Sequence, residues 1–561
     1  MSRKPLFIIS LCLLLTAGML YAGGSQSRTT GVTTITLYPA AGNISSGLMG
    51  GWKGDYFASR GFALDVWAFS DERTNAILAS GDLPDVMYVQ LQNLDDMING
   101  NMLVNLDEQL SKMPNALSYQ PLGMALNYIR QFRSAETGKL FVLPTSVGDN
   151  SAKYAVADST ERRAVKVRWD VFEQIGAPMP RNFDDLLDIM EQMLKASPRD
   201  NAGNPFYGTI LNNGSDTTYW ACMDLFYNWQ GYVSQHLPYL LEANMPTGEV
   251  SSILSTNSVY YQGLKWYNQA YRRNLMDRDS INNDRPTQKE KVDAGYALIP
   301  SGNLPGWAPQ FYEIYIPNTS IYYSYTSLYG GNGYIGISSK TRNIDASLAF
   351  LDMLCDADAA MVINNGPDGD YWYSDGNGNA FFTPAGLQHN LNALLADSTG
   401  YILKNGERLE LWNTPWVINS AADTSYKDGQ GGYRVSRVQQ WREFNELNSQ
   451  SESFKRWQQT TGYASWKDWL GTNFYAASPL DGVNEFCSLP DDNMQLIVSA
   501  LKDTVVTASW QMVYANNDNE FQSIWNKMVS DCQGLGAQRI IDWRLADIQT
   551  AKTVRDSLIT R

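Results

Sequence analysis

Residues 334–373, YIGISSKTRNIDASLAFLDMLCDADAAMVINNGPDGDYWY, contain the clearest information about the fold of this chain. The segment begins with a short strand, and a basic turn over residues 338–343 follows it. Apolar residues then recur near the helical period as far as Met361, which predicts a single helix with one buried face. The helix is expected to end at Gly366, and a turn leads from there to the aromatic residues 371–373.

The composition is typical of a folded, soluble protein. The chain has 561 residues, of which 44% are hydrophobic and 18% charged, and this length is enough for about two or three domains. The formal net charge of −15 argues against nucleic acids and anionic membranes as partners, because phosphate binding requires a basic patch. Aromatic residues make up 12% of the chain. Most of them are expected in cores, but the excess also suits stacking against sugar rings.

The first 22 residues have the features of a secretion signal. A positively charged start precedes an apolar run over residues 6–15, which is too short to span a membrane. Cleavage is expected after Ala22, and residues 23–31 form a small polar tether. Cys12 lies inside the apolar run and not at the cleavage point. We therefore predict a soluble exported protein, periplasmic or extracellular, without a lipid anchor.

Strands and helices alternate over residues 32–89. Strands are expected over residues 32–38 and 62–69, and a helix begins after Ser70 and ends near Gly81. The sequence GDLPDV then leads into a third apolar strand. This alternation predicts a parallel sheet with crossover helices.

The carboxyl ends of these strands are the expected place for a ligand, as in other open α/β sheets. Polar side chains at these ends are Asp71, Tyr88, Gln90 and Gln92. We take Asp71, Tyr88 and Gln90 as candidate ligand-binding residues, although each could be an ordinary loop residue.

Several segments resemble the extracellular solute-binding proteins of family 1, the sugar-capturing components of ABC importers, and in particular their long oligosaccharide-type branch. The matching segments are residues 81–86 (GDLPDV), 101–107 (NMLVNLD), 138–144 (GKLFVLP), 167–176 (VRWDVFEQIG), 334–343 (YIGISSKTRN) and 535–543 (LGAQRIIDW). The resemblance extends over nearly the whole chain after the signal.

This resemblance implies an α/β fold with two lobes and a hinge, the periplasmic-binding-protein or Venus flytrap fold. It implies a first lobe over residues 32–150 and a second lobe over residues 151–333. Residues 334–400 would supply a return strand, a helix and a cleft turn that rejoin the lobes. Residues 401–561 would form a mainly helical C-terminal region packed on both.

The resemblance also adds candidates for sugar binding. It implies that aromatic residues of the second lobe stack on sugar faces, although packing within a helix is an equally good interpretation of Trp220 and Trp229. Substitution of Trp372 by alanine is expected to weaken sugar binding at least tenfold and to leave the fold intact. The residues added in this way are Thr145 near the hinge, Trp220, Trp229, Trp307 in a glycine-containing loop, Tyr371 and Trp372.

The sequence offers no convincing catalytic or metal site. The chain has two histidines, His236 and His389, which leaves little for a histidine-based metal site or a Ser-His-Asp triad. Residues 200–205 resemble a shortened calcium loop without its closing acidic residues, and we interpret them as a turn. No cofactor and no metal are therefore expected.

Four cysteines remain after removal of the signal. In an oxidising compartment they could form one or two disulfides, or all four could be buried free thiols. Both interpretations stay open at this point. The cysteines are Cys222, Cys355, Cys487 and Cys532.

The function expected from these features is extracytoplasmic capture of a carbohydrate and its delivery to an ABC importer permease by hinged lobe closure. The chain is expected to act as a monomer and not as an enzyme. One alternative is a secreted glycan-processing enzyme. The other is the same fold with a peptide or another small solute as its ligand.

Overall fold

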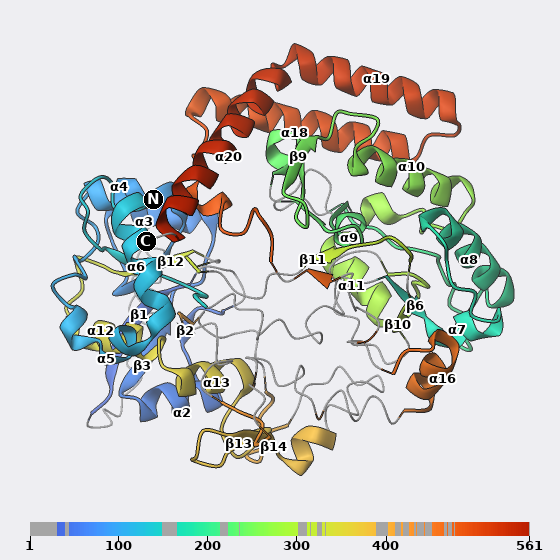
Figure 1. Ribbon diagram of the computed structural model, residues 1–561. Helices are drawn as coiled ribbons and strands as arrows, with labels where there is room; N and C mark the ends of the chain where they lie inside the picture. Colours follow the sequence, from blue (N-terminus) through green and yellow to red (C-terminus); the bar gives the residue numbers. More distant parts are fainter. Residues whose placement is uncertain are drawn as a thin grey trace, which may run out of the picture.

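The computed structural model of the chain forms two lobes (Figure 1). It describes residues 31–39, 44–148, 165–213, 223–234, 236–300, 311–314, 316–322, 328–330, 333–388, 402–409, 417–418, 426–430, 434, 443, 451–464, 468, 474–475 and 477–559. Each lobe has a hydrophobic core of its own. The first core gathers buried residues from 35–147 and 329–426, and the second gathers residues from 165–322 and 454–551. The predicted two-lobed α/β fold is therefore confirmed.

The first lobe is built on a six-stranded sheet with the order β2-β3-β1-β4-β12-β5. Strand β1 pairs in parallel with β3 and β4, as the alternation of strands and helices predicted. Strand β12 lies antiparallel between β4 and β5, so the chain returns to this sheet after it has built the second lobe. The strands are β1 (Thr33–Tyr38), β2 (Gly47–Leu48), β3 (Phe62–Val66), β4 (Val86–Val89), β5 (Val142–Pro144) and β12 (Tyr334–Ile337).

Seven helices of the described residues pack on this sheet or beside it. The crossover helix α3 begins where the sequence predicted, because Ser70 accepts a hydrogen bond from the backbone N–H of Arg73 at 3.1 Å. It ends at Gly81, which has a left-handed φ of 68°. The helices are α2 (Gly51–Ser59), α3 (Asp71–Ser80), α4 (Leu91–Asn99), α5 (Pro114–Ser118), α6 (Gln120–Phe132), α12 (Ile344–Met353) and α13 (Ala357–Asn365).

The single helix predicted after residue 343 is in fact two helices, α12 and α13. The break lies at Asp356, whose side chain accepts a hydrogen bond from the backbone N–H of Asp358 at 3.2 Å and so starts a new helix. Helix α13 ends as predicted at Gly366, whose φ is +86°. A turn over residues 375–379 joins the antiparallel strands β13 (Trp372–Ser374) and β14 (Ala380–Phe382).

The second lobe contains several helices around small sheets. Strand β6 pairs antiparallel with β10, and β7, β8 and β9 form a three-stranded sheet. Its elements are β6 (Lys166–Arg168), α7 (Trp169–Gln174), α8 (Phe183–Ala196), α9 (Met223–Asn228), β7 (Tyr232–Val233), η5 (Leu237–Tyr239), β8 (Leu241–Asn244), β9 (Glu249–Ser252), α10 (Val259–Arg272), η6 (Ser280–Asn282), α11 (Arg285–Asp293), β10 (Phe311–Glu313) and β11 (Ile321–Tyr322). Strand β11 pairs with β15 (Phe474–Tyr475) near the other end of the chain.

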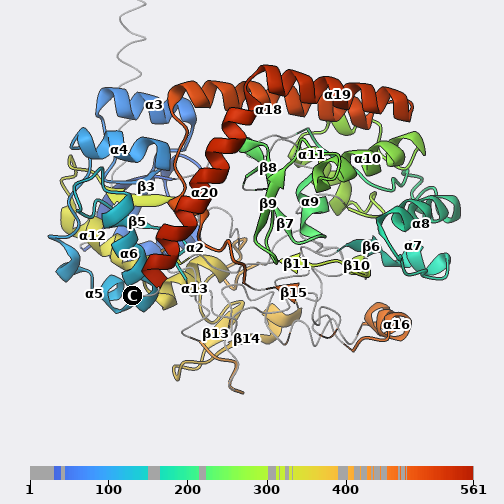
Figure 2. The same cartoon turned by 45° about the horizontal axis from the view of Figure 1, so that its top comes forward.

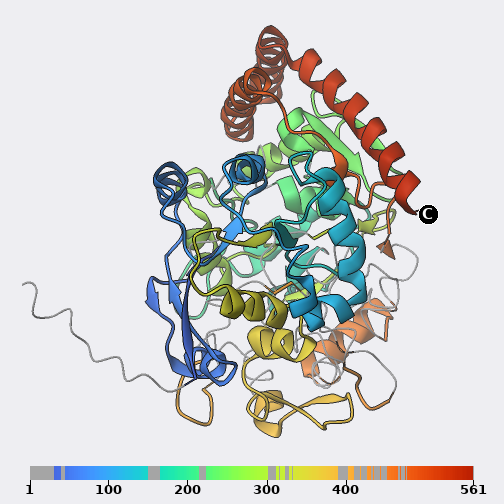
Figure 3. The same cartoon turned by 90° about the vertical axis from the view of Figure 1, so that its left-hand side faces the viewer.

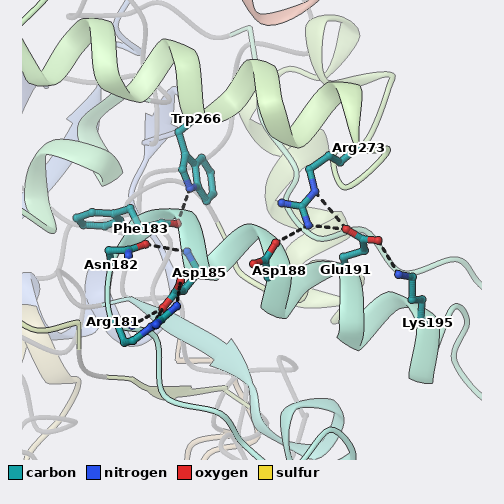
Figure 4. A network of polar contacts seen from close by, with 9 residues as sticks. All are labelled: Arg181, Asn182, Phe183, Asp185, Asp188, Glu191, Lys195, Trp266 and Arg273. Atoms are coloured by element: carbon teal, nitrogen blue, oxygen red, sulfur yellow. Dashed lines mark hydrogen bonds and ion pairs between the residues drawn. The ribbon is translucent and has the colours of Figure 1, made fainter.

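Helix α8 shows how local sequence signals fix an element of the second lobe (Figure 4). Asn182 caps the helix, because its Oδ1 accepts a hydrogen bond from the backbone N–H of Asp185 at 3.0 Å. Farther along α8, Glu191 forms ion pairs with Lys195 at 2.6 Å and with Arg273 at 2.5 Å. The indole of Trp266 donates to a backbone carbonyl at the start of α8 at 2.7 Å, which ties α10 to α8.

Replacement of Asn182 by alanine should lower the free energy of unfolding by about 1 kcal/mol, because the first turn of α8 loses its cap. Urea denaturation of the two proteins would measure this difference. The exposed Asn257, which makes no cap at α10, offers a matched Asn→Ala control and should change stability much less. Equal effects at both positions would show that the cap contributes nothing.

The C-terminal region is helical and spans both lobes. Helix α18 (Asp492–Val513) packs against α10 and against α19 (Asp518–Gly534) on the second lobe. Helix α20 (Ala537–Ile559) runs from there toward the first lobe (Figure 2), and it lies at the periphery of the molecule with the C-terminus at its end (Figure 3). A shorter helix, α16 (Glu452–Thr461), precedes these three. None of the described helices combines the length and the apolar character that crossing a membrane requires.

The segment before α18 connects the two lobes. Phe486, in the short helix η10 (Asn484–Phe486), packs against both hydrophobic cores. Its ring centroid lies 5.1 Å from that of Tyr128 in the first lobe. Arg133 and Tyr128 both donate hydrogen bonds to the carbonyl oxygen of Glu485. From the other side, Arg544 of α20 donates to Asn484 Oδ1 at 2.9 Å.

The three cysteines in the described part of the chain are buried. Cys355 belongs to the core of the first lobe, whereas Cys487 and Cys532 belong to that of the second. Burial raises the pKa of Cys487 and of Cys532 to about 12, and both carry free thiols. Cys222 lies outside the described residues.

Candidate ligand-binding site

A cavity of about 310 Å³ opens in the first lobe at the carboxyl ends of β1 and β4. This is the edge of the sheet at which the sequence predicted a ligand, and the volume is at the small end of the range for small-molecule sites. The residues that line it are Tyr38, Phe69, Thr74, Leu78, Met87, Tyr88, Val89, Gln90, Leu91, Gln92, Asn93, Met97, Gly333 and Tyr334.

One wall of the cavity comes from the end of β1 and the start of α3. Tyr38 is the last residue of β1, and its hydroxyl donates a hydrogen bond to the carbonyl oxygen of Ser70 at 2.9 Å. The same hydroxyl lies 2.8 Å from the hydroxyl oxygen of Thr74. The ring of Phe69 is tilted against that of Tyr38, with centroids 5.8 Å apart. Tyr38 is only 1% exposed and supports this wall from behind, so the half-buried ring of Phe69 supplies its aromatic surface.

A second part of the lining carries amide groups at the start of α4. Gln90 is the residue before the helix, and its side chain makes no cap to the helix backbone. Its Oε1 instead accepts a hydrogen bond from Gln92 Nε2 at 2.6 Å. Asn93 follows in the first turn, and Tyr88 leads into this part of the lining from β4 with 5% of its surface exposed. Amide groups of this kind can donate to and accept from the hydroxyls of a ligand.

The remaining lining is mostly apolar. Leu78 comes from the third turn of α3, Met97 from α4 and Met87 from β4. Burial raises the pKa of Tyr334, which closes one side, so its hydroxyl stays neutral at pH 7. Apolar lining with a few amides at one end is the usual composition of a site for a small polar molecule with apolar faces.

Two of the predicted site residues, Tyr88 and Gln90, are brought together at this cavity. Gln92, which was predicted to lie beside them, lines it as well. Asp71 is the first residue of α3, close to this edge of the sheet, but its side chain lies outside what the structure describes. Trp220 and Trp307 lie outside the described residues altogether.

Three predicted aromatic residues are core residues, and their assignment to the ligand is corrected. Trp229 is 2% exposed and stacks on Phe183 with ring centroids 5.4 Å apart, which is the alternative of helix packing. Tyr371 and Trp372 are 3% and 1% exposed, and they belong to the core of the first lobe and not to the second lobe. Their surfaces are already covered by protein, so none is left for a sugar ring.

The assignment of Thr145 to the ligand is also corrected, because this side chain is buried. The residue has no exposed surface, and its hydroxyl donates to the carbonyl oxygen of Gly333 at 3.1 Å. Its backbone N–H donates to the same oxygen at 3.0 Å. Thr145 therefore fixes the end of β5 beside the entry to β12, next to a residue that lines the cavity, without facing the cavity itself.

Sequence reasoning missed the aromatic wall of the site. Tyr38 was assigned to the first strand and Phe69 to the end of the second, and neither was taken as a candidate. The rule that selected Tyr88 also applies to Tyr38, because both lie at carboxyl ends of neighbouring parallel strands. That topological signal was available in the sequence.

The acidic loop at residues 200–204 is a turn, as predicted. Asp200 accepts hydrogen bonds from the backbone N–H groups of Ala202 at 2.9 Å and Asn204 at 2.7 Å. The Asn204 side chain also donates to this carboxylate, and these hydrogen bonds lower the pKa of Asp200. In the described part of the chain, no three His, Cys, Asp or Glu side chains are grouped as a metal ion would require.

No family model matches the chain. Among curated proteins it is similar to lipoprotein LipO of Bacillus subtilis, with 23% identity over 355 residues that cover 59% of this chain and 64% of that protein. It is also similar to the fructooligosaccharide ABC transporter substrate-binding protein FusA of Streptococcus pneumoniae, with 22% identity over 38% of each chain. These matches thus span less than two thirds of the relatives' own lengths.

Solved structures are similar over much more of the chain. An HMO-binding, ABC-transporter associated solute-binding protein of Bifidobacterium longum infantis superimposes with a TM-score of 0.59 and 16% identity, covering 94% of this chain and 99% of that one. FusA in complex with kestose superimposes with a TM-score of 0.59 and 14% identity, covering 94% and 100%. These likenesses confirm the resemblance seen in the sequence, and this chain has the two-lobed α/β fold of the solute-binding proteins of ABC transporters.

Proposed function

We propose that this protein captures a carbohydrate, an oligosaccharide, outside the cytoplasm and delivers it to the membrane permease of an ABC importer. The observation that carries the proposal is the cavity at the carboxyl ends of β1 and β4, which the half-buried rings of Phe69 and Tyr334 line together with amide side chains. Sugars need both kinds of contact, because their C–H faces stack on rings while their hydroxyls need donors and acceptors. The names of similar proteins agree, since FusA is named a fructooligosaccharide ABC transporter substrate-binding protein and the Bifidobacterium protein an HMO-binding one.

Capture would work by closure of the two lobes on the ligand. A sugar that contacts both lobes binds the closed form more tightly than the open form and shifts the equilibrium toward it. The two separate cores allow each lobe to move as a unit. The segment at Phe486, which packs on both cores, would act as one of the connections about which they turn.

The proposal includes no catalysis, since capture and release leave the sugar intact. The same proposal includes export through the signal at residues 1–22, action as a monomer, and recognition of the closed form by a permease. A secreted glycan-processing enzyme would instead cleave the sugar it binds.

A thermal-shift screen of residues 23–561 against mono- and oligosaccharides, with product analysis of every sugar that binds, tests the proposal. A ligand at a hundred times its dissociation constant should stabilise the protein by about 2.7 kcal/mol. Stabilisation by a sugar that is recovered intact is the expected result. Recovery of a cleaved sugar would establish an enzyme, and stabilisation by peptides alone would establish a different ligand.

Replacement of Gln90 by alanine should weaken binding of that sugar roughly tenfold, because one or two hydrogen bonds to ligand hydroxyls are lost. Isothermal titration calorimetry measures the change. Gln533, an exposed residue of α19, supplies a Gln→Ala control that should bind the sugar as the unchanged protein does. Unchanged affinity of the Gln90 variant would remove this part of the lining from the site.

A further inference from the structure

The described lining of the cavity contains no charged side chain. Its polar groups are amides and hydroxyls, contributed by Gln90, Gln92, Asn93, Thr74 and the tyrosines. A carboxylate or a sulfate on a ligand would therefore meet no cation within the cavity as the structure describes it. Removing such a charge from water without a partner costs several kcal/mol. The binding free energy of a charged ligand is less favourable by that amount than the binding free energy of its neutral counterpart.

Two arginines close to lining residues, Arg73 and Arg133, have other partners. Arg73, in the first turn of α3, lies over the ring of Trp67 with its guanidinium carbon 5.6 Å from the ring centroid. Arg133, whose charge acts on Tyr334, donates to the carbonyl oxygens of Phe132 and Glu485. Arg73 is thus held outside the lining of the cavity, whereas the side chain of Arg133 also hydrogen-bonds the lining residue Tyr334 and is already shared among three protein acceptors.

Besides Arg133, the positive features at the cavity among the described residues are the starts of α3 and α4, and each of them is weak. An exposed helix N-terminus favours an anion by only about 0.3–1 kcal/mol. This is less than the cost of burying an unpaired carboxylate, so the helix end does not reverse the preference. The same backbone N–H groups can donate to neutral hydroxyl oxygens. The formal net charge of −15 on the chain also disfavours the approach of an anion.

We infer that this cavity takes an uncharged sugar unit and rejects uronates, sialylated sugars and sulfated sugars. This inference rests on the proposed function, and it names the chemical class of the sugar. The volume of about 310 Å³ suits one ring of an oligosaccharide better than a whole chain. The half-buried apolar residues Phe69 and Leu78 would face the C–H groups of that ring, while the amides of α4 take its hydroxyls.

The first experiment compares two panels by thermal shift and calorimetry on residues 23–561. The neutral panel contains fructo-, malto-, xylo- and manno-oligosaccharides, and the acidic panel contains oligogalacturonides, oligomannuronates and sialyllactose. At least one neutral sugar should bind, and its form with an oxidised, carboxylate-bearing terminal unit should bind roughly a hundredfold more weakly. Equal or tighter binding of the acidic form would overturn the inference and leave the proposed function intact. Binding of neither panel would overturn both.

The second experiment places a cation at the mouth of the cavity. Gln92 is exposed, so its replacement by lysine should not disturb folding. Gln92→Lys should tighten binding of the carboxylate form roughly tenfold, whereas Gln533→Lys on α19 adds the same charge far along the chain and should change nothing. An equal gain in both variants, or no gain in Gln92→Lys, would show that charge at this cavity does not select the sugar.

Discussion

Substitution of Trp372 by alanine is expected to lower the free energy of unfolding of the first lobe by about 3–5 kcal/mol. Trp372 is 1% exposed and lies in the core of that lobe. Its indole N–H donates to the carbonyl oxygen of Gly366 at 2.9 Å, and its ring meets that of Tyr426 with centroids 6.0 Å apart. Alanine would leave a cavity in the core and an unpaired carbonyl, and both effects destabilise the lobe.

Hydrogen exchange measures this effect lobe by lobe, because amides in the first-lobe sheet report the opening of that lobe. Tyr373→Ala is the matched control in the same strand β13. Its side chain is 40% exposed, so the change should cost about 1 kcal/mol or less. Equal exchange in the Trp372 variant and the unchanged protein would contradict the burial of this side chain.

The same result would correct the expectation from the sequence that Trp372→Ala leaves the fold intact. A loss of sugar binding in this variant would follow from unfolding of the lobe and not from loss of a stacking surface. A Trp372→Ala variant that keeps its fold but binds the sugar more weakly would support the expectation from the sequence. Measuring both the stability and the sugar binding of this variant therefore distinguishes a core role of Trp372 from a ligand role.

Much of the first lobe could be predicted because its signals are local. The alternation of strands and helices indicated the parallel pairing of β1 with β3 and β4, and that pairing is confirmed. The cap at Ser70 was visible because a short polar side chain precedes the helix. The break at Asp356 was missed, since the apolar period continues across it and only the side-chain cap reveals the new helix.

The candidate site could be predicted in part, and the difference has a physical reason. Tyr88 and Gln90 were found because strand order alone places them at the edge where ligands bind. The burial of Trp229, Tyr371 and Trp372 depends on which distant segments pack over them, and no local pattern contains that information. An aromatic residue in a sequence is equally suited to a core and to a sugar, so composition could not separate the two.

Acidification should destabilise the second lobe through His236, beginning near pH 6.5. Only 2% of this side chain is exposed, and its Nδ1 has no hydrogen-bond partner among the described residues. Burial, with a smaller contribution from the positive charge of Arg544, lowers the pKa of His236 from 6.5 to about 3. Arg544 packs on Tyr239 and forms an ion pair with Asp547 at 2.9 Å. The carboxylate of Asp547 is therefore already paired with a cation.

The direction of the effect follows from where the proton binds. Between pH 6.5 and pH 3 the unfolded chain binds a proton at this histidine and the folded chain does not, so protons favour unfolding. The stabilisation from neutral His236 is complete above pH 6.5 and is lost as the pH falls toward 3. At pH 5 the loss amounts to about 2 kcal/mol relative to pH 7.

Urea denaturation at several pH values between 7 and 5, followed by tryptophan fluorescence, measures this dependence in the unchanged protein and in His236→Gln. Glutamine does not titrate in this range, so the variant should lose about 2 kcal/mol less than the unchanged protein over the same interval. The carboxylates are common to both proteins and cancel in the difference. Parallel curves would mean that His236 does not enter the folded state as a buried neutral group. A divergence of the expected sign would identify it as the residue that sets the acid sensitivity of the second lobe in this pH range.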